Sequence, residues 1–197
     1  MQRILLLLIM LFVVATLAGC AGNGEMIKAM SMNTRQDVFQ ELSAATPTPL
    51  GYSDLRIVSS LKTHMPGIYS AKDIHGTPEY MLLINVDGQA VQIAGSLRTA
   101  TREPQTLRDP EAGEGMRYLF QKELRLKPGR HRIFASLPFE GIAVERVIEL
   151  AEGSRNTLVL EPVYGSAPEK QRPGFYGVRS FKEGIRGFWV TYNGKSL

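Results

Sequence analysis

The feature that most restricts the fold is a pair of apolar runs, 80–86 and 89–93, separated only by Asp87-Gly88. A two-residue connection of this composition favours a type I′ turn, because both residues tolerate positive φ angles. Such a turn sets the register of the two strands. In this register the aliphatic side chains of one face lie opposite each other: Ile84 beside Val91, and Leu82 beside Ile93. The sequence therefore predicts a β-hairpin with one face buried in a core.

Two further turns are flanked by residues that alternate with a period of two. One is the Pro-Gly turn at 127–130 and the other is the Gly turn at 152–154. We interpret each as the turn of a hairpin. The paired segments are 118–126 with 131–137, and 142–150 with 157–163. Because a single hairpin is unstable in water, these strands must share a core. The predicted fold is mainly β, an antiparallel Ig-like β-sandwich over residues 53–165.

Two polar segments are assigned from composition. Residues 99–115 contain Pro and Gly and are predicted to form a long surface loop. The carboxylates of this loop are Asp109, Glu111 and Glu114. Because their spacing does not match a calcium-binding loop, we expect them to be solvated. Residues 166–197 begin as a loop and end in a strand that we expect to pack on the sandwich. The alternating residues of that strand are Phe188, Val190 and Tyr192.

Residues 20–52 precede the sandwich and contain a helical pattern. Asn33 is followed three residues later by a glutamine, which resembles a capping box. Three apolar residues then follow at helical spacing: Val38, Phe39 and Leu42. We therefore expect a short helix that begins at Asn33 or Thr34. Small residues at 21–24 predict a flexible tether before the helix, and the prolines of 46–51 predict an extended linker after it.

The first 20 residues have the pattern of an export signal. A basic start, Met1–Arg3, precedes an uncharged apolar run at 4–14 that is too short to span a bilayer. The next residues, Leu17-Ala18-Gly19-Cys20, resemble the lipobox of bacterial lipoproteins. The resemblance implies that residues 1–19 are a signal peptide, cut between Gly19 and Cys20. It also implies that a diacylglyceryl group is attached to the sulfur of Cys20.

Lipid on Cys20 predicts a membrane-anchored protein, because two or three acyl chains bind a bilayer durably whereas one does not. Cys20 is the only cysteine, so we expect no disulfide and no thiolate metal site. Ala21 lacks the acidic character that retains such proteins at the inner membrane. In a diderm host this favours the periplasmic face of the outer membrane. The net charge of +4 is spread along the chain, which argues against a nucleic-acid partner.

The segment Leu126-Lys127-Pro128-Gly129-Arg130-His131 resembles the small Ig-like β-sandwich modules of the PEGA type, which occur in bacterial envelope proteins. In these modules a strand, a Pro-Gly turn with a nearby histidine and a second strand lead to a Gly turn and a strand rich in Leu and Val. Glu152-Gly153 and Leu158-Val159-Leu160 correspond to the last part, so that the resemblance covers residues 80–163. It implies display and interaction without catalysis.

Candidate catalytic and metal-binding residues do not form a recognisable motif. The three histidines are His64, His75 and His131, and none of them has the spacing of a common zinc site. We therefore expect no metal and no cofactor. The turn at Pro66-Gly67 could bring His64 and His75 together, but the sequence alone does not predict this contact. His131 is interpreted as a residue that binds backbone beside its turn. The candidate serines are Ser70, Ser96, Ser136 and Ser154, and no base lies near them in sequence. We therefore predict no catalytic residues.

The C-terminal strand supplies the candidate interaction surface. If Phe188 and Val190 face the core, Trp189 points outward, and an exposed tryptophan with Arg186 suits protein binding. The sequence thus favours a lipid-anchored, non-catalytic module that binds another envelope protein or supports an envelope assembly. Two alternatives stay open. One is binding of an envelope glycan such as peptidoglycan or lipopolysaccharide, and the other is a hydrolase whose residues come together only in space.

Overall fold

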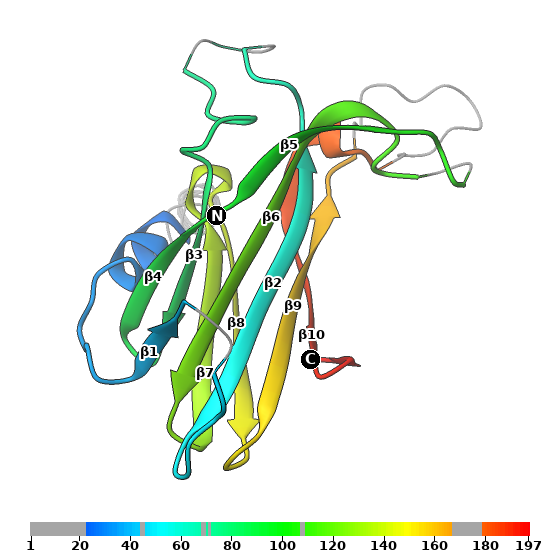
Figure 1. Cartoon of the computed structure of the whole chain (residues 1–197). Coiled ribbons are helices and arrows are strands. Elements are labelled where there is room, and N and C mark those ends of the chain that lie inside the picture. Colours follow the sequence, from blue (N-terminus) through cyan, green and yellow to red (C-terminus); the bar gives the residue numbers. More distant parts are fainter. Residues whose placement is uncertain (1–22, 44–45, 68–69, 71, 107–108, 167–178) are drawn as a thin grey trace, which may run out of the picture.

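The computed structural model describes residues 23–43, 46–67, 70, 72–106, 109–166 and 179–197. In these residues two β-sheets pack face to face around one hydrophobic core, and a short helix at 23–30 lies outside them (Figure 1). The mainly β fold with a short helix near the N-terminus is confirmed.

Sheet A is the larger sheet, with strand order β1-β6-β2-β9-β10-β11, and β5 also pairs with β6. Its strands are β1 (Phe39–Leu42), β2 (Ser53–Thr63), β5 (Ser96–Arg102), β6 (Gly113–Leu126), β9 (Arg155–Tyr164), β10 (Ile185–Tyr192) and β11 (Lys195–Ser196). Sheet B has the order β4-β3-β7-β8. Its strands are β3 (Met81–Val86), β4 (Gln89–Ala94), β7 (Gly129–Leu137) and β8 (Ile142–Leu150). All pairs are antiparallel except β2 with β9. Two 3-10 turns are η1 (Pro138–Glu140) and η3 (Phe181–Glu183).

The hairpin predicted at Asp87-Gly88 is confirmed. It joins β3 to β4, and the facing pairs are Ile84 with Val91 and Leu82 with Ile93. Asp87 and Gly88 have φ angles of 47° and 98°, as a type I′ turn requires. The turn also holds the segment before β1, since the backbone N–H groups of Thr34 and Arg35 both donate to the Gly88 carbonyl.

The other two predicted hairpins are wrong. The turn at 127–128 carries the chain from β6 in sheet A to β7 in sheet B, and residues 151–154 carry it from β8 back to β9. Both connections lie at the lower end of the sandwich in Figure 1. The reason is that no edge is free for the expected pairing: β6 has β2 on one side and β1 and β5 on the other, while β9 lies between β2 and β10. The alternating apolar faces instead meet across the core.

The surface loop predicted at 99–115 is shorter than expected. Residues up to Arg102 form β5, and β6 begins at Gly113. The side chains of β5 are largely exposed, so a polar sequence is compatible with a strand that uses only one edge of β6 for its hydrogen bonds. The loop that remains lies at the upper end of the sandwich (Figure 1).

The predicted position of the helix is also wrong. The helix spans 23–30, which overlaps only the end of the expected tether, and the apolar residues assigned to it instead form β1 and the residue before it. The Asn33 side chain accepts a hydrogen bond from the backbone N–H of Ala90 and caps no helix. Gln89 binds the same segment, because its side-chain oxygen accepts from the N–H groups of Val38 and Phe39. Contacts with the hairpin therefore override the helical spacing.

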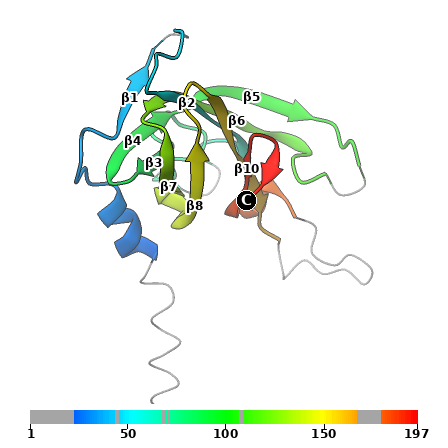
Figure 2. The same cartoon turned by 90° about the horizontal axis from the view of Figure 1, so that it is seen from below.

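The helix packs on the outer face of sheet B. Ile27 is buried there against Leu83 of β3 and Phe134 of β7, in a cluster separate from the main core. Figure 2 shows the helix on the side of sheet B that faces away from sheet A. The N-terminal end of the described chain is thus held against one defined face of the sandwich.

Candidate functional site

Trp189 and Arg186 both lie on β10 with exposed side chains. Phe188 and Val190 are buried in the core, as expected for a strand with one inner face, and Trp189 on the opposite face is 57% exposed. Arg186 occupies an irregular position, because the register with β9 shifts between Ile185 and Gly187. Trp189 therefore presents a large aromatic ring on the outer face of sheet A.

The residues of the predicted processing site, Gly19 and Cys20, lie outside the described residues, as does most of the loop expected at 166–178. In the described part of the chain, no helix is both long and apolar enough to cross a membrane.

A group of titratable side chains lies at the upper end of the sandwich in Figure 1, around the loop that leads from β2 to β3. His64 directly follows the last residue of β2, Asp73 and His75 lie in the loop, and Glu140 belongs to η1. His64 Nε2 is 3.3 Å from one Asp73 oxygen, and His75 Nδ1 is 2.5 Å from the other. The fold therefore brings together the two histidines that the sequence left unpaired.

Each histidine in this group is also held through its second ring nitrogen. His64 Nδ1 lies 3.0 Å from the backbone carbonyl of Met65, and His75 Nε2 lies 2.8 Å from Glu140 Oε1. The same Glu140 oxygen accepts a hydrogen bond from the Tyr80 hydroxyl at 2.9 Å. A carbonyl or carboxylate oxygen can only accept, so His64 Nδ1 and His75 Nε2 donate in these contacts, and His75 Nδ1 donates to Asp73 when the ring carries both hydrogens.

Burial and charge act in opposite directions on the pKa values of the group. Burial lowers the pKa of His75, but hydrogen bonds to Glu140 and Asp73 outweigh it and the pKa is raised. Burial raises the pKa of Asp73, but hydrogen bonds from His75 outweigh it and the pKa is lowered. The pKa of Tyr80 is raised, first by burial and then by the charge of Glu140. Chemically, the group can bind a cation or share protons between imidazole and carboxylate.

A second polar group lies in the core next to the first. Lys62 is fully buried, and its Nζ donates to the carbonyls of Glu111 and Gly113 at 3.0 and 2.5 Å. The Glu111 carboxylate accepts from Arg117 at 2.5 Å, from Arg102 at 3.1 Å and from the Tyr164 hydroxyl at 2.8 Å. This group ties the loop before β6 to the C-terminal ends of β2 and β9.

The expectation that the loop carboxylates are solvated is therefore wrong for two of the three. Glu111 is largely buried within its ion pairs, and the Asp109 side chain is buried beside Arg102 at 3.1 Å. Glu114 is exposed as expected. Sequence reasoning missed this network because its two arginines come from β5 and β6, strands that pair only in the folded chain.

His131 has the predicted backbone contact and one further partner. Its Nε2 lies 2.8 Å from the Lys127 carbonyl, and its Nδ1 lies 2.7 Å from the Asp87 carboxylate in the neighbouring hairpin turn. The candidate serines bind backbone groups. The hydroxyls of Ser96, Ser136 and Ser154 donate to carbonyls, and Ser70 Oγ accepts from the Lys72 N–H.

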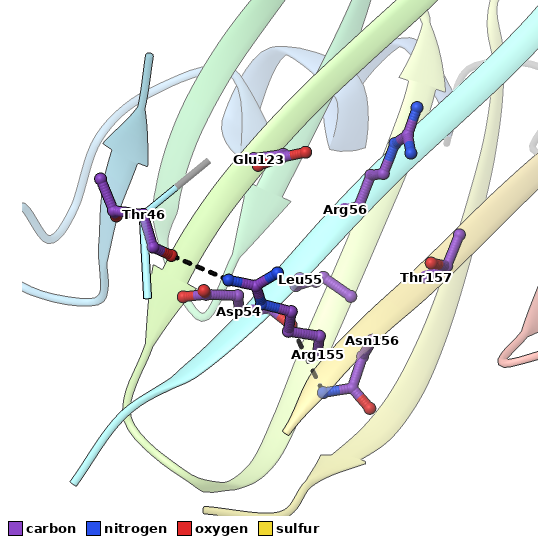
Figure 3. A pocket seen from close by; sticks show the side chains of 8 residues that line it. All are labelled: Thr46, Asp54, Leu55, Arg56, Glu123, Arg155, Asn156 and Thr157. Carbon is purple, nitrogen blue, oxygen red and sulfur yellow. Dashed lines mark hydrogen bonds between the residues drawn. The ribbon is translucent and has the colours of Figure 1, made fainter. Parts of the chain in front are cut away.

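A shallow polar groove of about 240 Å³ crosses the outer face of sheet A near the start of β2 and β9 (Figure 3). Arg155 reaches across it to the Thr46 carbonyl at 3.0 Å, and Asn156 bonds the Asp54 carbonyl. Asp54 pairs with Arg125 at 2.8 Å. The other lining residues are Leu55, Arg56, Glu123 and Thr157. The groove offers hydrogen-bond donors and acceptors, and all eight lining side chains are non-aromatic.

Compared with known protein families, with curated proteins and with solved structures, the chain matches none of them.

Proposed function

We propose that this protein is a lipid-anchored envelope lipoprotein whose Ig-like β-sandwich binds another envelope protein without catalysis. The observation that carries the proposal is the short distance along the chain between Cys20 and the described helical residues 23–30. Three residues span at most about 11 Å. A lipid on Cys20 would therefore hold the helix, and the sandwich beneath it, next to the bilayer surface.

The position of the helix also gives the sandwich an orientation. The helix packs on the outer face of sheet B, whereas Trp189 projects from the outer face of sheet A. With the helix side toward the membrane, Trp189 points into the periplasm, where a protein partner can reach it. Exposed tryptophan is uncommon on surfaces without partners and frequent at the energetic centres of interfaces. The address proposed for the protein is the periplasmic face of the outer membrane.

The anchor is tested by the intact mass of the mature protein extracted from membranes. We expect a mass that corresponds to cleavage before Cys20 plus two or three acyl chains, because this is the product of lipobox processing. In Cys20→Ala we expect the uncleaved precursor. A wild-type protein recovered unmodified from the soluble fraction would contradict the proposal.

The interaction surface is tested by chemical crosslinking in intact cells that express either wild type or Trp189→Ala. We expect a specific crosslinked species in the wild type that is reduced at least about tenfold in the variant, since truncation of an interface anchor costs about 2 kcal/mol or more. Leu119→Ala is the matched control, because Leu119 is an exposed apolar residue on β6 of the same sheet. Equal loss in both variants, or crosslinks that neither variant changes, would exclude Trp189 as the anchor.

The alternative of glycan binding is favoured by one feature, the polar groove of Figure 3. Its arginine, amide and hydroxyl groups suit the hydroxyls and phosphates of envelope glycans. Sugar rings also stack on aromatic side chains, however, and the groove has none in its lining. Protein binding is therefore the first choice.

A further inference from the structure

We propose that His64, Asp73 and His75 form a binding site for a divalent transition-metal ion of the zinc class. The ligand atoms of the three side chains all lie within 4.8 Å of one another. Two imidazole nitrogens and one carboxylate are a donor set that zinc accepts, and they are poorly suited to calcium or magnesium, which prefer oxygen. The inference uses only the folded sandwich and does not depend on the lipid anchor.

The hydrogen bonds of the two rings prepare them as ligands. His64 Nδ1 is occupied by the Met65 carbonyl and His75 Nε2 by Glu140, so the remaining nitrogens, His64 Nε2 and His75 Nδ1, both face Asp73. Metal-binding histidines have this arrangement, in which the second nitrogen donates to a carbonyl or carboxylate that orients the ring. Glu140 is itself held by Tyr80. Both ligands therefore have the supporting contacts that a metal site needs.

The contacts and charges of the group suit a cation. His75 Nδ1 lies 2.5 Å from one Asp73 oxygen and His64 Nε2 lies 3.3 Å from the other. Without a metal a proton must lie between His75 Nδ1 and Asp73, and a metal ion would take its place. Asp73 and Glu140 also bring two negative charges into a region where their side chains are largely buried. One divalent ion between the rings and Asp73 balances both charges.

One of the spacings in the group already matches tetrahedral coordination. Bonds of about 2.1 Å place neighbouring ligand atoms about 3.4 Å apart in a tetrahedral site. His64 Nε2 lies 3.3 Å from one Asp73 oxygen, whereas His75 Nδ1 lies 2.5 Å from the other and would have to move away from it when an ion binds. Three protein ligands leave one position for water or a ligand from solvent. Such an ion would join the end of β2 in sheet A to η1 of sheet B through Glu140.

The test is a titration of the purified protein with zinc chloride after treatment with a chelator. Calorimetry and elemental analysis of the dialysed protein are expected to give one zinc ion per chain, and zinc is expected to raise the Tm. Glu140→Gln should weaken binding about 10–100-fold, the usual effect of changing a group that orients a ligand. His64→Gln and Asp73→Asn should weaken binding further and abolish the rise in Tm. His131→Gln is the matched control and should bind like wild type, because His131 is equally buried and lies in a different turn.

Cobalt-loaded wild type provides a test that needs no variant to fold. Paramagnetic shifts in the ring signals of His64 and His75, with none in those of His131, are expected in the nuclear magnetic resonance spectrum. The proposal is overturned if wild type retains no zinc or cobalt. It is equally overturned if zinc binds with the same affinity to His64→Gln and Asp73→Asn, or if the shifted signals belong to His131.

Discussion

Replacing Phe120 with alanine is expected to lower the free energy of unfolding by about 3–5 kcal/mol, the usual cost of removing a fully buried aromatic side chain. Phe120 lies on the inner face of β6 and is completely buried in the main core. Its ring stacks on that of Tyr118 with centroids 5.6 Å apart, and it covers Gly95 where the chain passes from β4 to β5. The cavity left by alanine would therefore lie between the two sheets.

The preceding residue on the strand provides the control for this prediction. Leu119 faces outward from β6 and is 42% exposed, so Leu119→Ala should change the free energy of unfolding by about 0.5 kcal/mol or less. Urea unfolding followed by circular dichroism measures both variants. Similar losses in the two would mean that the inner and outer faces of β6 are wrongly assigned.

The second large effect is expected for Glu111→Ala. This substitution leaves the guanidinium groups of Arg102 and Arg117 and the hydroxyl of Tyr164 without their shared acceptor. Removing one member of a largely buried ion pair costs about 3 kcal/mol or more, because the remaining charge stays desolvated. Glu114→Ala, in the exposed neighbouring position, should cost about 0.5 kcal/mol or less. Equal urea midpoints for the two variants would show that the network contributes nothing to stability.

The same network gives the stability of the protein a pH dependence. Burial raises the pKa of Glu111, but hydrogen bonds from Arg117 and Tyr164 and the charges of Arg117 and Arg102 outweigh it, and the pKa is lowered. A carboxyl with a lowered pKa in the folded state stabilises the protein above its unfolded pKa of about 4.3, and this contribution is lost as the pH falls further. Urea midpoints from pH 7 to acid should therefore fall less steeply in Glu111→Gln than in wild type or in Glu114→Gln.

Much of the fold could be predicted because it depends on short-range geometry. The turn at Asp87-Gly88 follows from the backbone angles that those two residues allow, and its length alone sets the register of β3 and β4. The alternation on β10 likewise identifies Phe188 and Val190 as inner residues and Trp189 as an outer one. A period of two reports which side of a strand faces the core, whatever the strand pairs with.

Only the tertiary structure decided which strands pair and which side chains meet. Alternation on β6 and β7 is the same whether they form a hairpin or face each other across the core, and the choice depends on β2, which takes the edge that β7 would need. His64 and His75 meet because β2 ends and the following loop turns back over η1, and Glu111 is buried because β5 and β6 bring two arginines to it. Sequence determined the turn at Asp87-Gly88 and the buried faces of the strands. The partners across the core follow from the arrangement of strands distant in the chain, which no local pattern encodes.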